Sequence, residues 1–349
     1  MMKLKFYNAV YLFVFIWFFS CSDAGTNIYK NITGKAGEIV VVISKQSWEG
    51  DPGTVIRETL AQSHVALPQD EPIFDIINIP HDAFKDIFKS TRNIIQINIS
   101  SNTEEEGIIF KDNIWAYPQA TVQINAKSAN RFVEIFNENK EKILSYFLAA
   151  EKERLITNYS KYYEKGILNI LDRDFDASIK VPPGFRTMAQ KKDFLWIQYD
   201  TPEIFQGILI YTFPYVSDSA FTVNYQLSVR DSIMKANVSG PTEGSYMSTE
   251  KSIDQAASFT RLNGNYANEM RGLWRVENDF MGGPYISLAV LDAAKQRVVV
   301  AFGYVYAPSK DKRNLLRQVE AMVYSLKFNN QAENDKLNRQ TNFEVNIEG

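Results

Sequence analysis

Two segments in the second half of the chain combine the residue types that proteins place in recognition loops. They are 240–250 (GPTEGSYMSTE) and 271–285 (RGLWRVENDFMGGPY), and both mix glycine with aromatic and charged residues. Loops of this composition often carry binding groups on a rigid scaffold. They could hold a ligand by cation–π contact and by close approach of glycine backbone. The candidate binding residues are Ser245, Tyr246, Glu250, Arg271, Trp274, Gly282 and Gly283.

A packing role is the alternative for the same residues. Trp274 and Phe280 lie near the predicted ends of strands, where aromatic side chains usually belong to the core. Gly282 and Gly283 would then shape the turn that enters the next strand. Replacing Arg271 or Trp274 by alanine separates the two hypotheses. Loss of folding indicates packing, whereas loss of binding in a stable protein indicates recognition.

Residue types that catalyse reactions are sparse. The two histidines, His64 and His81, have no second ligand at metal-binding spacing, and we expect each at the surface or at a helix end. Gly244-Ser245-Tyr246 lacks the second glycine of the G-x-S-x-G turn of serine hydrolases. Neither a GxxxxGK[ST] phosphate loop nor a GxGxxG fingerprint is present. We therefore predict no catalytic residue, no metal site and no cofactor.

Paired carboxylates leave one enzymatic alternative open. An envelope hydrolase acting on glycan or peptidoglycan needs two carboxyl groups across a cleft, roughly 5 to 10 Å apart. Acidic residues occur in both candidate loops, but the sequence does not show that any two of them face each other. We favour a non-enzymatic binding or assembly module over this hydrolase.

The N-terminus has the layout of an export signal. Lys3 and Lys5 precede an unbroken apolar run over 9–19. This run is too short to cross a membrane, which takes roughly 20 residues of α-helix. We therefore expect a cleaved signal peptide over 1–20 and no membrane-spanning helix in the mature protein.

The only cysteine of the chain, Cys21, follows this apolar run directly. The segment 18–21 (FFSC) resembles a lipobox, at which bacteria attach diacylglycerol to the thiol and cleave before the cysteine; Phe18 stands where leucine is usual. An ordinary signal peptide with a chance cysteine is the alternative, but an unpaired thiol is disfavoured in exported proteins. Lipid on Cys21 is the interpretation that we adopt.

Charge and location limit the partners that we expect. Without Lys3 and Lys5 the mature chain has 36 basic residues against 41 acidic ones, a formal charge of −5. Such a chain lacks the clustered basic residues on which nucleic-acid binding depends, so we predict no nucleic-acid partner. The expected partners are the membrane, through lipid on Cys21, and an envelope protein or glycan. The expected location is the cell envelope, at the outer membrane on its periplasmic or surface side.

The first half of the chain predicts a sheet packed by helices. The β-branched run 38–43 (EIVVVI) is typical of a buried strand, and Asp51-Pro52 predicts the start of a helix that ends near Ser63. Apolar residues at helical spacing after Ser128 predict a long closing helix. Further strands are expected at 73–79, 93–99, 108–116 and 120–125.

The second half predicts paired strands closed by helices. The strongest strand signals are 194–199 and 207–215, and helices are predicted over 221–236 and around Val319. Adjacent strands can pair antiparallel without helical crossovers. Further strands are expected at 257–262, 266–276, 285–292 and 297–306, the last two as a hairpin.

The predicted fold class is therefore α+β, with two sheet-plus-helix domains of largely antiparallel strands after the signal peptide. We place the anchor and linker at 21–36, the first domain at 37–165, the second at 175–328 and a disordered tail at 329–349. Apolar periodicity is almost lost in that tail.

Segments spread along the mature chain carry a family resemblance. They are 37–50 (GEIVVVISKQSWEG), 92–95 (RNII), 114–119 (IWAYPQ) and the two candidate loops. Together with the lipobox they resemble a Bacteroidota lipoprotein family catalogued as domain of unknown function 4837, over nearly the whole mature chain. The family has no established activity. The second half also resembles the PsbP-type fold, whose members are mostly binding or assembly factors, and this resemblance favours binding.

Overall fold

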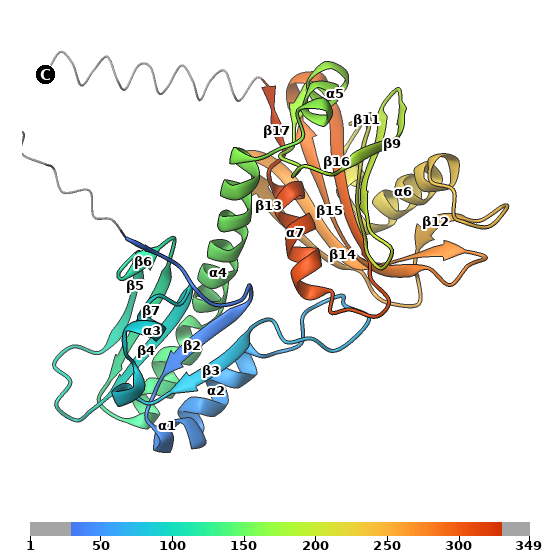
Figure 1. The fold of residues 1–349 in the computed structure, drawn as a ribbon. Coiled ribbons are helices and arrows are strands. Elements are labelled where there is room, and N and C mark those ends of the chain that lie inside the picture. Colours follow the sequence, from blue (N-terminus) through green and yellow to red (C-terminus); the bar gives the residue numbers. More distant parts are fainter. Residues whose placement is uncertain (1–28, 330–349) are drawn as a thin grey trace, which may run out of the picture.

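A computed structural model describes residues 29–329 of the chain (Figure 1). The predicted signal peptide, Cys21 and all but Asn329 of the predicted tail lie outside the described residues. None of the described helices is both long and apolar enough to cross a membrane. Two bodies of sheet and helix are visible, and a long helix, α4 (Ala129–Lys161), runs from the first towards the second (Figure 1).

The first body is built on a five-stranded sheet in the order β3-β2-β4-β7-β5. Pairing is parallel except between β5 and β7. The continuous apolar run of β2 suits this arrangement, because a central parallel strand is buried on both faces. The strands are β2 (Glu38–Val42), β3 (Asp75–Ile79), β4 (Asn93–Ile99), β5 (Gly107–Asp112) and β7 (Ala120–Ala126).

Helices cover this sheet as the apolar spacing predicts. α2 (Asp51–Leu60) has proline in its first turn, and α4 begins after Ser128, whose hydroxyl accepts a hydrogen bond from the N–H of Arg131. Phe132, Phe136 and Phe147 of α4 are buried in the core of the first body. The shorter elements are β1 (Lys30–Asn31), α1 (Lys45–Glu49), η1 (His81–Ala83), α3 (Asp86–Lys89) and β6 (Ala116–Tyr117).

The second body is an antiparallel sheet of eight strands in the order β12-β14-β15-β16-β11-β10-β9, with β13 beside β14. Its long strands are β11 (Phe205–Pro214), β14 (Asn265–Glu277), β15 (Gly282–Asp292) and β16 (Arg297–Tyr306). The shorter ones are β9 (Arg186–Lys191), β10 (Phe194–Asp200), β12 (Tyr246–Thr249) and β13 (Ala256–Leu262).

Helices pack on both faces of this second sheet. α7 (Arg313–Tyr324) buries Leu316, Val319 and Met322 against one face, and α6 (Val223–Asn237) lies on the other (Figure 1). We call these the α7 face and the α6 face. α5 (Lys165–Phe175) adds to the core on the α7 face. The remaining elements are β8 (Ala177–Ser178), η2 (Asp218–Phe221), η3 (Ala293–Lys295) and β17 (Lys327–Phe328).

The α+β fold class with two domains is confirmed, and antiparallel pairing dominates the chain as a whole. The parallel sheet of the first domain is the exception. Its strands β2, β3, β4 and β7 do not follow one another as hairpins, since helices or loops separate them and return the chain to the same edge.

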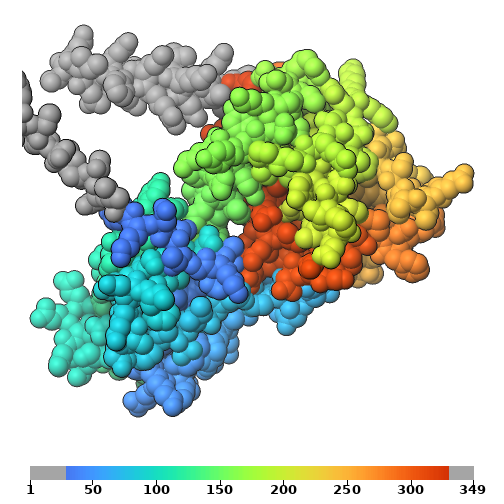
Figure 2. Space-filling model, in the orientation of Figure 1, coloured from blue at the N-terminus to red at the C-terminus, as the bar shows by residue number. Residues whose placement is uncertain are grey.

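The two domains meet through α7. The carboxylate of Glu71, from the first domain, accepts the backbone N–H groups of Lys312 and Arg313 at 2.7 and 2.8 Å. It thereby satisfies donors that the start of a helix leaves free, and it adds negative charge at the positive end of the helix dipole. Arg313 pairs with Asp75 at 2.7 Å. Figure 2 shows the blue segment of the first domain lying against the red surface of α7.

Candidate functional site

Arg271 and Trp274 lie on one strand, β14, and not in a loop. Successive side chains of a strand point to opposite faces of the sheet. Arg271 reaches Glu320 of α7, whereas Trp274 packs in the core on the α6 face. The structure therefore does not bring these two predicted binding residues together. Only 278–281 of the segment 271–285 is a loop. β14 and β15 contain the rest, which confirms the strands expected at 266–276 and 285–292 and contradicts the loop interpretation of the same residues.

The other predicted loop is likewise partly a strand. Ser245 is buried, and its hydroxyl donates to the carbonyl oxygen of Thr242 at 2.6 Å. Tyr246 begins β12. The Glu250 carboxylate accepts hydrogen bonds from the hydroxyl and the N–H of Ser252, which lower its pKa. The segment 240–250 is thus a loop only as far as Ser245 and again at Glu250.

Arg271 belongs to an ionic network that joins the two domains. Its guanidinium contacts Glu269 at 2.7 Å and Glu320 at 3.1 Å. Lys152 of α4 reaches the same Glu320 at 3.5 Å, and its ammonium group lies 3.5 Å from the ring centroid of Tyr324. Burial alone would lower the pKa of Arg271, but the carboxylates of Glu320 and Glu269 raise it above its ordinary value. Arg271 therefore stays charged.

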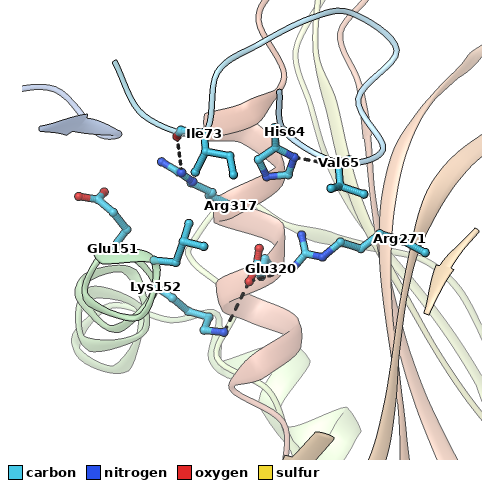
Figure 3. A pocket seen from close by; sticks show the side chains of 10 residues that line it. His64, Val65, Ile73, Glu151, Lys152, Arg271, Arg317 and Glu320 are labelled. Atoms are coloured by element: carbon cyan, nitrogen blue, oxygen red, sulfur yellow. Dashed lines mark hydrogen bonds and ion pairs between the residues drawn. The ribbon is translucent and has the colours of Figure 1, made fainter. Parts of the chain in front are cut away.

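The network forms one wall of a cavity of about 290 Å³ between the domains (Figure 3). Side chains from α4, α7, β13, β14 and the segment after α2 surround it, so neither domain alone encloses the space. Its walls are partly apolar, and its polar groups are mainly charged. The lining residues are His64, Val65, Ile73, Leu148, Glu151, Lys152, Ala256, Arg271, Arg317 and Glu320.

The sequence predicts His64 at the surface or at a helix end; the residue is half-buried, lies shortly after the end of α2 and lines this interdomain cavity. Its Nδ1 lies 2.9 Å from the carbonyl oxygen of Val65, so Nδ1 carries the proton and Nε2 is an acceptor. Burial, together with the charges of Arg271 and Arg317, lowers the pKa of His64 to about 4. The ring is therefore neutral at physiological pH. Figure 3 shows it between those two arginines.

Arg317 differs from Arg271 and Lys152 in that it forms no ion pair within residues 29–329. One of its Nη atoms donates to the carbonyl oxygen of Ile73 at 2.6 Å, and the guanidinium lies 4.8 Å from the ring centroid of Phe74. Its Nε and Nη1 have no hydrogen-bond partner among residues 29–329. Burial lowers the pKa of Arg317 to about 10. The cavity wall thus holds more positive than negative charge when His64 is neutral.

On the α6 face, Trp274 is buried and its indole Nε1 donates to the carbonyl oxygen of Val305 at 3.1 Å. Gly283 lies between them: a Cβ there would be 2.1 Å from that oxygen and 3.3 Å from Nε1. A Cβ on Gly282 would be 2.8 Å from the carbonyl oxygen of Trp274. Both glycines therefore make room for packing within the sheet.

Sequence reasoning missed His64, Lys152, Arg317 and Glu320 as cavity residues. His64 follows α2, Lys152 lies on α4, and Arg317 and Glu320 lie on α7, so no local spacing connects all four. One signal was available on α7, where Arg317 and Glu320 stand among Leu316, Val319 and Val323 on the buried side of the helix. Charged residues on the apolar side of an amphipathic helix indicate a buried ionic contact.

Comparison with known families assigns the two halves to different models. Residues 164–325 match the model described as Domain of unknown function (DUF4837), and residues 32–160 match Domain of unknown function (DUF8532). The chain joins two domains of unknown function. The resemblance to DUF4837 is thus supported for the second half, while 37–50, 92–95 and 114–119 fall in the DUF8532 match.

Three solved structures show a distant likeness, each aligned over less than half of this chain. The Ran-binding protein Mog1p of Saccharomyces cerevisiae is 11% identical over 44% of this chain and 90% of its own, with a TM-score of 0.30. LpqN, involved in cell envelope biogenesis of Mycobacterium tuberculosis, is 12% identical over 43% and 82%, with a TM-score of 0.27. A chain from Bacteroides thetaiotaomicron VPI-5482 is 8% identical over 44% of each chain, with a TM-score of 0.23. No curated protein matches the sequence.

Proposed function

We propose that this protein is a lipid-anchored binding protein of the bacterial cell envelope, without enzymatic activity, that holds a small ligand between its DUF8532 and DUF4837 domains. The lipobox-like segment ending at Cys21 supports the anchor. The origin in Bacteroidota and the PsbP-type fold of the second domain are part of the same proposal. A protein in the envelope that binds a ligand between two domains would act as a receptor or as an assembly factor, and this is the role that we propose.

The cavity between the domains is the observation that carries the binding role. Ligand sites form preferentially where two domains meet, with apolar walls and a few polar groups that orient the ligand. Here Val65, Ile73 and Leu148 supply apolar surface, while His64 offers a neutral acceptor and Lys152 a cation. The excess of positive charge favours a small molecule with an apolar body and an anionic group.

The carboxylates of the cavity support binding more than hydrolysis. A glycosidase acid needs a raised pKa so that it is protonated near neutral pH. Burial alone would raise the pKa of Glu320, but the charges of Arg271 and Lys152 lower it below its ordinary value. Glu151 accepts from Asn93 and Arg154 at 2.8 and 2.7 Å. Both carboxylates are thus engaged in ion pairs or hydrogen bonds.

A pair of neighbouring alanines on β13 allows a matched test. Ala256 lines the cavity, whereas the side chain of Ala257 points to the other face of the strand. We expect native mass spectrometry of the protein purified gently from its own envelope to show a bound small molecule. Ala256→Trp, which fills the cavity, should lose that ligand, and Ala257→Trp should retain it. A wild-type protein without ligand, or equal retention by both variants, would contradict the proposal.

The anchor is tested separately by cell fractionation. Wild-type protein should remain with the membranes in high salt and leave them in detergent, since two or more acyl chains hold a protein stably on a bilayer. Cys21→Ala should appear in the soluble envelope fraction. Salt-extractable wild-type protein would refute lipid anchoring and leave the cavity hypothesis untouched.

A further inference from the structure

A second pocket, of about 350 Å³, opens on the α6 face of the same sheet, beyond the C-terminal end of α6. We call it the Trp274 pocket. It is separated from the interdomain cavity by the sheet, since Trp274 and Arg271 point to opposite faces of β14. Its lining residues are Met188, Trp196, Gln198, Phe205, Val238, Ser239, Gly240, Pro241, Met247, Trp274, Val276, Met281 and Tyr304.

Two glycines let aromatic rings form the floor of this pocket. A Cβ on Gly207 would lie 2.2 Å from the ring of Tyr304, so that ring occupies the space over β11. On β15 a Cβ on Gly283 would lie 2.1 Å from the carbonyl oxygen of Val305, which Trp274 Nε1 binds, and 3.3 Å from that nitrogen. The rings of Trp274 and Tyr304 meet edge to face with centroids 5.3 Å apart. The floor is therefore a rigid aromatic surface, fixed by the sheet beneath it.

The ring-borne polar groups of the floor already have partners. Trp274 Nε1 donates to the carbonyl oxygen of Val305 at 3.1 Å, and Trp196 Nε1 donates to the hydroxyl of Tyr304 at 2.9 Å. That hydroxyl donates in turn to Oε1 of Gln198 at 2.6 Å. A ligand with charged or strongly polar groups would lose its hydration at this floor without replacement hydrogen bonds. The floor offers mainly carbon surface.

The walls are uncharged and adaptable. None of the thirteen residues that line the Trp274 pocket carries a formal charge. Met188, Met247 and Met281 contribute unbranched side chains that can adjust to the shape of an apolar ligand. Met188 is 42% exposed, which places the mouth of the pocket at the surface. An uncharged pocket of this kind complements an uncharged, flexible hydrocarbon.

We propose that the Trp274 pocket binds an alkyl chain. The proposal is independent of the interdomain ligand, because it rests on a different face of the sheet and on different side chains. The alkyl chain enters past Met188 and Met281 and packs against the half-buried rings of Trp196 and Phe205, above the buried floor. A free fatty acid and the tail of a membrane lipid share this chemistry.

A chain-length series of neutral alkanols tests the proposal by calorimetry. Each methylene that enters the pocket should tighten binding about fourfold, from the roughly 0.8 kcal/mol that its burial contributes. The increment should vanish once the pocket is full. Binding that does not saturate, or affinity that does not depend on chain length, would overturn the proposal.

Variants at the rim test the location. Met188→Glu and Met281→Glu place a carboxylate beside the bound chain and should each weaken dodecanol binding at least tenfold, while Met281→Leu should retain it. Val216→Glu is the control, since Val216 is 86% exposed and does not line the pocket. Circular dichroism checks that each variant folds. Unchanged affinity in Met188→Glu would refute the site even if Met281→Glu failed to fold.

Extraction of the bound molecule distinguishes a free fatty acid from a membrane lipid as the source of the alkyl chain. Protein purified from its own envelope is denatured in solvent, and the released lipids are identified by mass spectrometry, with Met188→Glu as the control. Enrichment of free fatty acid or of phospholipid over that control assigns the source. No enrichment of any alkyl-bearing molecule would contradict binding in the envelope.

Discussion

The two faces of β14 carry opposite kinds of cavity. On the α7 face Arg271 joins Glu320 and Lys152 in a charged network between the domains. On the α6 face, three residues further along, Trp274 lies on the floor of an uncharged pocket. The alternation of a single strand thus separates an ionic site from an apolar one by the thickness of a sheet. The difference teaches that residues close together in sequence can line cavities of opposite character.

The ionic face should be the more sensitive one to the loss of a single group. Glu320→Gln removes the negative charge that Arg271 and Lys152 share, and leaves a buried arginine less well compensated. We expect a loss of about 3 kcal/mol in the free energy of unfolding, measured by denaturant titration; this is the lower end of the range for a broken buried pair, because Arg271 keeps Glu269. Glu203→Gln is the control, because the exposed pair of Glu203 with Lys310 should contribute less than about 1 kcal/mol. Equal effects would mean that the network is only a surface contact.

On the α6 face, stability should depend on how closely the residues pack and not on charge. Gly283→Ala puts a Cβ where only 2.1 Å separates it from a backbone oxygen of β16, so the strands must shift. The expected loss of unfolding free energy is about 3 kcal/mol. Gly166→Ala, in an open helical position of α5, should instead stabilise the protein by roughly 0.5 to 1 kcal/mol. A tolerated Gly283→Ala would show that β15 and β16 can move apart, and that the floor they support is not rigid.

The pH dependence of stability should report the environment of His64. Its pKa is about 4 in the folded protein, against 6.5 ordinarily. Between these values the unfolded chain binds the proton and the folded one does not, so stability is complete above pH 6.5 and falls as the pH is lowered towards 4. The loss should be on the order of 3 kcal/mol, from about 1.4 kcal/mol for each pKa unit. His64→Gln should lack this component, which subtraction of the two unfolding curves isolates. Parallel curves would place His64 in water.

The elements of the fold were largely readable from local patterns. The β-branched run 38–43 predicted β2, and the helical spacing of aromatic residues from Phe132 to Phe147 predicted α4; the structure contains both. The parallel order of the first sheet was not readable, because β2 pairs with both β3 and β4 through contacts that are distant in sequence. Pairing is decided by tertiary packing, which periodicity does not record.

The sites were less predictable than the elements. Arg271 and Trp274 were singled out as one loop, since glycine and charge in 271–285 resemble turn chemistry. Alternation along a strand, had it been applied to them, would have placed them on opposite faces. His64, Lys152 and Glu320 line the interdomain cavity but come from three separate parts of the chain. The residue spacing within any one of these parts does not predict that they lie close together.

The smallest effect is expected at the turn 278–281 between β14 and β15, where two adjacent residues distinguish the surface from the pocket. Phe280 is fully exposed, whereas Met281 lines the Trp274 pocket. Phe280→Ser should change the free energy of unfolding by less than about 0.5 kcal/mol, as surface substitutions usually do. Met281→Ser should cost about 1 kcal/mol and weaken alkanol binding, because it removes apolar contact from the wall. If Phe280→Ser were the variant that lost alkanol binding, the bound alkanol would lie across the turn and outside the pocket.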